Sequence, residues 1–461
     1  MKEYINRFKE GYHKITDICL SFIEKHFLLI LLIAMTAGAL TIRYLSALHP
    51  TNDMVGYILN GWMGQIQEVG FSKFYTIDAD YSPLFLFVIA IISRIPGGEM
   101  VTINGYTFHP VHMYLLKSVY FLTDVLSAVA IYLILFHILK DKVKASIGYC
   151  IFLVLPAQFV NSAVWGNCDS VYACFFLYAI YFILKRKDYL VWFFFGLALS
   201  LKMQAVFILP FLVYLCLSRR LKFYPIVMAV LAIMLSFLPS YCCGASFTQP
   251  FTYFSKQING YTNVTLGCAN FWKFFGITNM DSSSEPFNKA STWIGLLLIT
   301  FFCGLVYLRK IRLTDKNIVY VATFLISIVP YFLPHMHERY FYILDVMVVL
   351  YSLLSKKKRH YFILLMQLSS LIAYYHYMTG FSTYFINSWG EDSVTIAAII
   401  NTVILGIVFY DLMKLDHDQL HSGKTGKEGK TQETSKPDEA ITEGSSDERN
   451  HIQEICSDTQ N

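Results

Sequence analysis

The chain has 461 residues, of which 55% are hydrophobic, 16% aromatic and only 15% charged, and its mean hydropathy is +0.47. One soluble core could not bury so much apolar surface, so this composition excludes an ordinary water-soluble enzyme and indicates an all-α polytopic membrane protein. The formal net charge of +5 does not indicate nucleic-acid binding, because most Lys and Arg residues flank apolar segments, as cytoplasmic loops do.

The N-terminal region contains two kinds of sequence. Residues 1–26 alternate apolar and charged positions, which predicts an amphipathic helix on the cytoplasmic leaflet. The apolar segment 27–47 that follows has no small-residue cleavage site at its end, so it predicts a retained first membrane helix rather than a signal peptide.

Further apolar segments predict membrane helices along the rest of the chain, and with the first they make about twelve spans in a domain of residues 27–413. They cover residues 113–138, 145–161, 168–184, 189–201, 203–217, 222–243, 290–308, 317–334, 340–355, 361–378 and 394–413. The pair 189–201 and 203–217 is short, so we expect a tight or broken pair there.

Basic clusters test this arrangement. All of them fall on the cytoplasmic side if both termini are cytoplasmic and residues 48–112 form one outer loop. The apolar piece 83–95 is too short to span, so it predicts an interfacial or re-entrant helix within that loop. A second outer loop is expected at 244–289. The clusters lie at residues 140–144, 185–187, 219–222, 309–312 and 356–359.

Two further features concern the ends of the chain and its thiols. Residues 414–461 are polar and nearly free of aromatic residues, which predicts a disordered cytoplasmic tail. The ten Cys residues are scattered; Cys242, Cys243 and Cys268 share an outer region and could pair, or they are free thiols buried as small hydrophobic residues.

Ionisable residues gather at the predicted outer ends of the helices. Asp53 follows the first span, Asp169 begins another, and Lys202 with Gln204 lies in the break between two short spans. Residues 337–339, His-Glu-Arg, separate two long apolar segments. Charge at a membrane boundary is costly unless it lines a wet cavity or binds a ligand, so this clustering predicts a functional site.

Other candidates have structural alternatives beside the functional one. Lys117 and Asp124 lie seven residues apart on one helix face, either as a structural pair or as part of the site. Lys202 could reach outward to headgroups, and Asp169 could cap a helix. Asp78 and Asp80 have the spacing of a divalent-metal ligand pair, which leaves a divalent metal as an alternative, but too few oxygen donors accompany them, so we expect no cofactor.

Carboxylates beside cations at an outer membrane surface suit sugar transfer from a lipid phosphate. Arg or Lys holds the phosphate as charge develops on it, and a carboxylate takes the proton of the acceptor hydroxyl.

At these residues the sequence resembles the GT-C glycosyltransferases, which use polyprenyl- or dolichyl-phosphate sugars. Bacterial relatives of the mannosyl- and glucosyltransferases of the GPI-anchor and N-glycan pathways are the most similar group. The resemblance covers residues 27–413. Its motifs are Tyr81-Ser82-Pro83-Leu84, Trp165-Gly166-Asn167-Cys168-Asp169-Ser170, Lys202-Met203-Gln204 and His337-Glu338-Arg339-Tyr340-Phe341, and Asp53 matches the position of the catalytic acid.

The resemblance implies an inverting transfer of a hexose, preferably mannose, on the outer face of a bacterial plasma membrane. The acceptor would be a glycolipid, a cell-wall polymer or a protein. Asp53 would be the general base, and Arg339, His337 and Lys202 would bind the donor phosphate. The supporting residues would be Glu338, Asp80, Tyr81, Asp169, Gln204, Lys117 and Asp124.

Two rival functions make different demands on the sequence. A transporter or flippase of a lipid-linked saccharide predicts internal repeats and polar groups near the membrane midplane, whereas the sequence has no evident repeat and places its charges near one surface. A non-catalytic scaffold leaves the cluster of outer charges without a cause.

Overall fold

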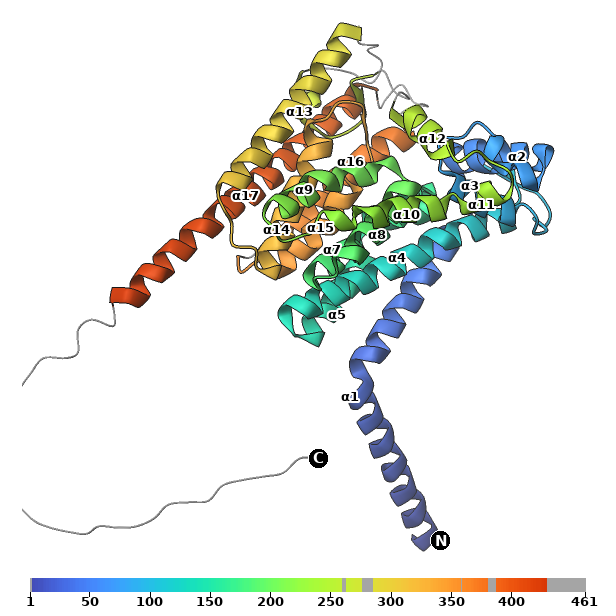
Figure 1. Ribbon diagram of the computed structural model, residues 1–461. Coiled ribbons are helices and arrows are strands. Elements are labelled where there is room, and N and C mark those ends of the chain that lie inside the picture. The colour runs from blue at the N-terminus through green and yellow to red at the C-terminus, as the bar shows by residue number, and fades with distance from the viewer. Residues whose placement is uncertain (1, 259–262, 276–284, 358, 380–386, 429–461) are drawn as a thin grey trace, which may run out of the picture. The chain divides into compact units, whose positions relative to one another are not determined.

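The computed structural model describes residues 2–258, 263–275, 285–357, 359–379 and 387–428. The chain divides after Asp416, and the described residues before that point form one compact unit. The described part is helical, with two small two-stranded sheets (Figure 1). An all-α polytopic fold is therefore confirmed.

The first helix and the loop at residues 48–112 hold more structure than the sequence predicts. α1 is continuous from Lys2 to Ser46, so no helix end marks the expected boundary after residue 26. The loop contains the short helix predicted at 83–95 and also a hairpin, which turns at Asn104-Gly105 with positive φ at both residues, as a two-residue turn requires. Its elements are η1 (Asn52–Met63, π-helical), α2 (Gly64–Val69), η2 (Phe71–Thr76), α3 (Pro83–Ile92), β1 (Val101–Ile103) and β2 (Tyr106–Phe108).

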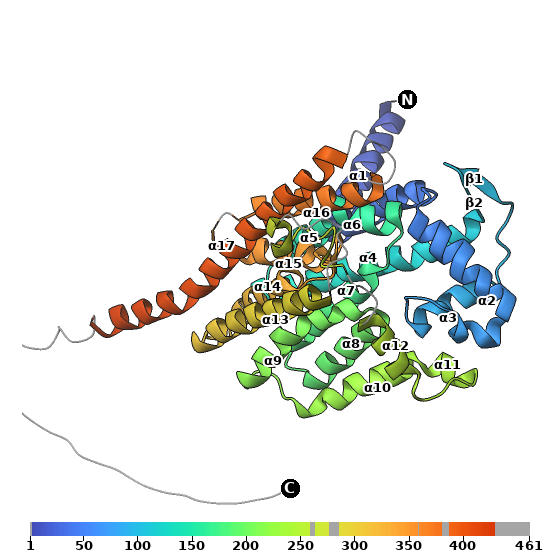
Figure 2. The same ribbon diagram turned by 90° about the horizontal axis from the view of Figure 1, so that it is seen from above.

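The next helices form a layer in which α4, α7, α8 and α10 lie side by side (Figures 1 and 2). One span is bent, and one pair of short spans is separated by an extended residue. Pro156 lacks an N–H, and the helix bends by 47° between α5 and the α6–η3 segment. Lys202 has extended backbone angles and separates α8 from η4, which confirms the broken pair. These elements are α4 (Pro110–Leu139), α5 (Lys142–Leu153), α6 (Pro156–Phe159), η3 (Val160–Trp165), α7 (Asp169–Leu184), α8 (Asp188–Leu201), η4 (Met203–Ile208), α9 (Leu209–Leu217), η5 (Tyr224–Ile226) and α10 (Val227–Ser236).

The C-terminal half places two buried helices, α14 and α15, at the centre of the large apolar core. α17 continues to Glu428, so the predicted tail is helical from residue 414 to 428, and residues 429–461 lie outside the described part. The elements are α11 (Leu238–Cys242), α12 (Gln249–Ile258), β3 (Thr265–Leu266), η6 (Phe271–Phe275), α13 (Glu285–Leu308), α14 (Asp315–Phe332), β4 (Met336–His337), α15 (Tyr342–Leu354), α16 (Tyr361–Thr379) and α17 (Asn387–Glu428).

Several helices are long and apolar enough to cross a membrane. Four described helices meet this test, or five with the bent α5–η3 pair, and further apolar helices of 10–17 residues accompany them. On α13, Trp293, Leu297 and Phe301 recur every fourth residue and are each more than half exposed, which suits a lipid-facing stripe. The chain is a multi-pass membrane protein, while the count of about twelve spans stays a prediction.

A buried polar network fixes α16 against α15 and the broken helix. The Asp345 carboxylate of α15 accepts hydrogen bonds from Ser370 and Gln367 of α16 at 2.9–3.2 Å. Gln367 Oε1 in turn accepts the backbone N–H of Ala157, 2.8 Å away, at the start of α6. These bonds set the position of the next two turns of α16, which reach the candidate site. The sequence left open a disulfide among Cys242, Cys243 and Cys268, but all three are free thiols in the structure.

Candidate active site

The Asp53 carboxylate is held by two donors from distant elements. Asp53 lies in the first turn of η1, which begins after Thr51; the Thr51 side chain accepts the N–H of Met54 and donates to the carbonyl of Trp165. Trp165 Nε1 donates to Asp53 Oδ2 at 2.9 Å, and the Tyr377 hydroxyl donates to Asp53 Oδ1 at 3.1 Å. Both carboxylate oxygens therefore have a fixed partner.

Lys202 and Asp169 form a buried ion pair. The helix break at Lys202 directs the side chain to Asp169 Oδ1 and, at 3.3 Å, to the amide oxygen of Asn167. The other carboxylate oxygen of Asp169 accepts a hydrogen bond of 2.9 Å from Asn161. The N-cap residue of α7 is Cys168, so Asp169 does not act as the helix cap.

Arg339 contacts both this ion pair and Trp165, the residue that donates to Asp53. Its Nη1 donates to Glu338 Oε1 at 2.5 Å, its Nε lies 3.9 Å from Asp169 Oδ2, and its guanidinium lies over the Trp165 ring, 5.4 Å from the centroid. Asp53 and Arg339 thus contact the same indole. Burial alone would raise the pKa of Glu338, but Arg339 and His337 outweigh it and bring this pKa to about 2.

The strand β3, from the predicted loop 244–289, holds the His-Glu-Arg segment in place. β3 pairs in parallel with β4, with Leu266 opposite His337, and the Glu338 N–H donates to the Leu266 carbonyl at 3.2 Å. His335 has a left-handed φ of 62° and its ring bonds to the carbonyl of Asn263 at 2.7 Å. Burial and the neighbouring Arg339 lower the pKa of His337, which is therefore neutral at pH 7.

Lys117 and Asp124 do not pair with each other, so the pairing considered for them is wrong. Two helical turns separate them, and each meets different elements. Lys117 donates to backbone carbonyls, including that of Ala163 at 2.8 Å. Asp124 pairs with the buried Arg43 of α1 at 2.9 Å and accepts a hydrogen bond from Ser162.

Besides Asp53, residues 48–112 contribute Tyr81 to the site. The Tyr81 hydroxyl donates to Asn167 Oδ1 at 3.3 Å, beside Lys202. Asp80 is 69% exposed and lies, like Asp78, near Lys256 of α12. Among the described residues no group of three or more potential metal-ligating side chains occurs.

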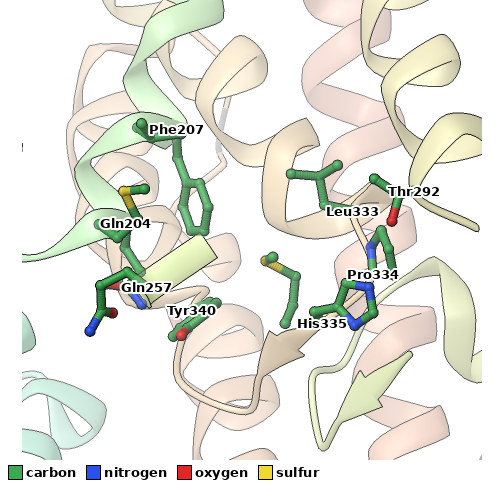
Figure 3. Close-up of a pocket in the computed structure, with 11 residues that line it drawn as sticks. Gln204, Phe207, Gln257, Thr292, Leu333, Pro334, His335 and Tyr340 are labelled. Atoms are coloured by element: carbon green, nitrogen blue, oxygen red, sulfur yellow. The ribbon is translucent and has the colours of Figure 1, made fainter. Parts of the chain in front are cut away.

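A largely apolar cavity of about 260 Å³ is lined in part by sequence neighbours of Lys202 and Arg339. In Figure 3, Phe207 and Gln257 lie on one side of it and Leu333 and Thr292 on the other. It is lined by Met203, Gln204, Val206, Phe207, Gln257, Thr292, Leu333, Pro334, His335, Met336 and Tyr340. Two predicted site motifs therefore share this cavity wall, since Gln204 follows Lys202 and Tyr340 follows Arg339.

Sequence reasoning missed several residues of this site. Trp165 belongs to a quoted motif but had no expected role, and Asn161 and Tyr377 were not singled out. The tyrosine-rich end of the segment 361–378 was the only sequence signal for Tyr377. Its partner, Asp53, lies 324 residues away, so no local pattern connects the two.

The fold and site define a multi-pass membrane protein with cations, carboxylates and an apolar cavity at one place. The family model of glycosyltransferase family 87 matches residues 81–334, more than half of the chain, so the chain belongs to this family. This membership confirms the resemblance to a glycosyltransferase. The match includes Asp169 and Lys202 and ends before Arg339.

Comparison with solved structures adds a similarity in chain path. The crystal structure of ArnT from Cupriavidus metallidurans bound to undecaprenyl phosphate matches over 87% of this chain and 80% of that chain, with 12% sequence identity and a TM-score of 0.47. No curated protein matches this chain.

Proposed function

We propose that this membrane glycosyltransferase moves a hexose, preferably mannose, from a polyprenyl-phosphate sugar to an acceptor hydroxyl by an inverting displacement. The observation that carries the proposal is the shared indole: Trp165 contacts Asp53 through its N–H and Arg339 through its ring face. A carboxylate and a guanidinium on one ring suit an acceptor hydroxyl and a donor phosphate on opposite sides of a sugar.

Arg339 and Lys202 are the proposed phosphate-binding cations, with His337 beside them. Each cation has a carboxylate partner, Glu338 and Asp169 respectively, which offsets the cost of burying the charge before the donor binds. When the sugar leaves, the phosphate changes from a diester to a monoester and gains negative charge. Preorganised cations at that position stabilise the transition state more than the ground state.

Asp53 is the proposed general base. It accepts the proton of the acceptor hydroxyl while the oxygen attacks the anomeric carbon, and the bond from that carbon to the phosphate oxygen breaks in the same displacement. One displacement inverts the anomeric configuration. Trp165 and Tyr377 leave the carboxylate with fixed orientation, so a free lone pair can face the acceptor.

The polyprenyl chain is the proposed occupant of the cavity at Phe207 and Thr292. Its walls are largely apolar and suit a lipid chain, and its lining includes Met203 and Tyr340, the sequence neighbours of the proposed phosphate-binding residues Lys202 and Arg339. Replacing Thr292 by Trp should raise the KM for long-chain donors several-fold and leave a short-chain donor unaffected. The same substitution at Thr300, which is exposed on the same helix, is the matched control.

For the membrane face of the site, the acceptor and the use of a metal, our proposals are those expected from the sequence. We propose that the site faces the outside of the plasma membrane, that both termini are cytoplasmic, and that the acceptor is a glycolipid, a cell-wall polymer or a protein. We also propose that no metal is needed, because Lys202 and Arg339 supply positive charge at the phosphate and Asp78 and Asp80 both lie near Lys256. Activity should then survive EDTA; a requirement for added Mg²⁺ or Mn²⁺ would contradict this.

The direct test uses purified full-length protein in nanodiscs with radiolabelled polyprenyl-phosphate mannose or glucose and candidate acceptors. Transfer should release polyprenyl phosphate, and Asp53→Asn should reduce the rate by at least about 100-fold. Glu285→Gln, an exposed change on α13, should keep full activity. Movement of the labelled lipid across the bilayer of proteoliposomes without cleavage would instead support a flippase.

A further inference from the structure

We infer that Tyr377 is a positioning residue that fixes the Asp53 carboxylate for proton transfer. The inference rests on the proposed role of Asp53 as the base. Tyr377 lies in the last turn of α16, on an element that neither the family match nor the sequence motifs include. Its hydroxyl donates to Asp53 Oδ1 at 3.1 Å.

Tyr377 makes a second contact that sets its own orientation. Its ring stacks on Trp165 with the centroids 5.0 Å apart and the planes inclined by 27°. Trp165 is almost fully buried, and Tyr374, one turn earlier on α16, packs edge-on against the same indole at 5.4 Å. The phenol is therefore held by a rigid neighbour rather than by the flexible end of a side chain.

The two donors to Asp53 act on different oxygens. Trp165 Nε1 bonds to Oδ2 and the Tyr377 hydroxyl bonds to Oδ1, so rotation about the Cβ–Cγ bond would break at least one of them. With a single donor the carboxylate plane could turn by tens of degrees and misalign the accepting lone pair. Positioning of this kind affects the chemical step, because misplacing a reacting group by a small distance lowers the rate steeply.

The position of α16 is itself well determined. Gln367 and Ser370, two to three turns before Tyr377, bond to the buried Asp345 of α15, and Gln367 also bonds to Ala157 of α6. The α6–η3 segment then leads to Trp165. The hydrogen bond between Gln367 and Ala157 therefore joins α16, which carries Tyr377, to the segment that carries Trp165. This connection fixes the separation of the two donors to Asp53.

The test is Tyr377→Phe in full-length protein in nanodiscs, assayed for hexose transfer. The ring and its stacking on Trp165 remain, and only the hydroxyl is lost. We expect kcat to fall by about 10-fold, as for a hydrogen bond to a charged group, with the donor KM and the melting temperature unchanged. Tyr375→Phe is the matched control, because Tyr375 is 60% exposed on the same helix, and its kcat should equal that of the wild type.

A second variant tests the other donor to Asp53. Trp165→Phe keeps a ring under Arg339 and removes the other donor to Asp53, so it should also lower kcat; the double variant with Tyr377→Phe should approach the rate of Asp53→Asn. An unchanged kcat in Tyr377→Phe, or a higher donor KM with unchanged kcat, would overturn the inference. If Asp53→Asn itself retains activity, the proposed base is wrong, which is a different result from a silent Tyr377→Phe.

Discussion

Asp53 and Arg339 contact opposite features of one side chain, the N–H edge and the ring face of the Trp165 indole. Asp53 comes from the loop between α1 and α4 and Arg339 from the segment between α14 and α15, nearly 300 residues later. The indole therefore sets the separation of the proposed base and the proposed phosphate-binding cation. A change in either residue should affect catalysis in its own way.

The first prediction concerns Arg339→Lys. Lysine keeps the charge but loses the planar fork that bonds to Glu338 and stacks on Trp165. We expect kcat/KM for the donor to fall by at least about 10-fold, with most of the loss in KM if the residue binds the phosphate in the ground state and in kcat if it acts in the transition state. Steady-state kinetics at several donor concentrations separates the two.

The control for this change is Arg94→Lys. Arg94 is exposed, follows α3 and lies over Phe71 at 5.7 Å, so the change also weakens a cation–π contact but does so outside the candidate site. Its kinetics should match the wild type. Equal losses in both variants would show that the effect at Arg339 is general rather than specific to the site.

The sequence predicts most of the helices because the membrane makes their signal strong. A long apolar segment between polar residues has few alternatives to a helix, and every predicted span falls on a helix or on a broken pair. The break at Lys202 and the short helix at Pro83 were also predictable, since both depend on residues that are local in sequence.

The site was only partly predictable, because its geometry depends on pairings between distant segments. The charged motifs indicated Asp53, Lys202 and Arg339, but a motif does not say which residue lies between them. The β3–β4 pairing joins residues about 70 positions apart through two-residue strands, which carry no periodicity. The π-helix that carries Asp53 likewise has no sequence signal distinct from an α-helix.

The second prediction uses the lowered pKa of His337. Because the folded protein holds this imidazole neutral, the unfolded chain binds more protons than the folded one once the pH falls below the unfolded pKa of about 6.5. Stability should therefore decrease as the pH drops from 6.5 toward the lower folded pKa, by at most about 1.4 kcal/mol per pH unit for this group. When the pH is lowered from 7.5 to 5.5, the melting temperature of His337→Gln should fall by less than that of the wild type. An equal loss in both proteins would contradict this role of His337.

The third prediction concerns close helix packing at Gly196. A Cβ at Gly196 of α8 would lie 2.6 Å from the Cα of Ala229 on α10, and backbone cannot move aside as a flexible side chain can. Gly196→Ala should destabilise the protein by about 1–3 kcal/mol by forcing the two helices apart. Gly304→Ala on α13 is the matched control, because a Cβ there meets no atom within 4 Å, and it should be neutral or stabilising by up to about 1 kcal/mol. Thermal unfolding in the same detergent measures both, and equal effects would rule out the packing explanation.

The last prediction concerns the buried pair of Arg43 and Asp124, which joins α1 to α4. Arg43 is 2% exposed and Asp124 fully buried; Arg43 also donates to the carbonyl of Leu153, and Asp124 also accepts a hydrogen bond from Ser162. Arg43→Leu leaves a buried carboxylate without its cation, and we expect a loss of about 3–5 kcal/mol.

Adding Asp124→Leu should recover most of that stability, because two apolar side chains remove both buried charges and suit the surrounding apolar core. The double variant should also keep the donor KM of the wild type, since neither residue contacts Asp53, Lys202 or Arg339 through a hydrogen bond or ion pair in the described part of the chain. A double variant that is stable but inactive would instead assign this pair a direct part in the reaction. That result would agree with the alternative, given from the sequence, that Asp124 is part of the site. Measuring the melting temperature and the transfer rate of all four proteins of the cycle distinguishes a structural pair from a catalytic one.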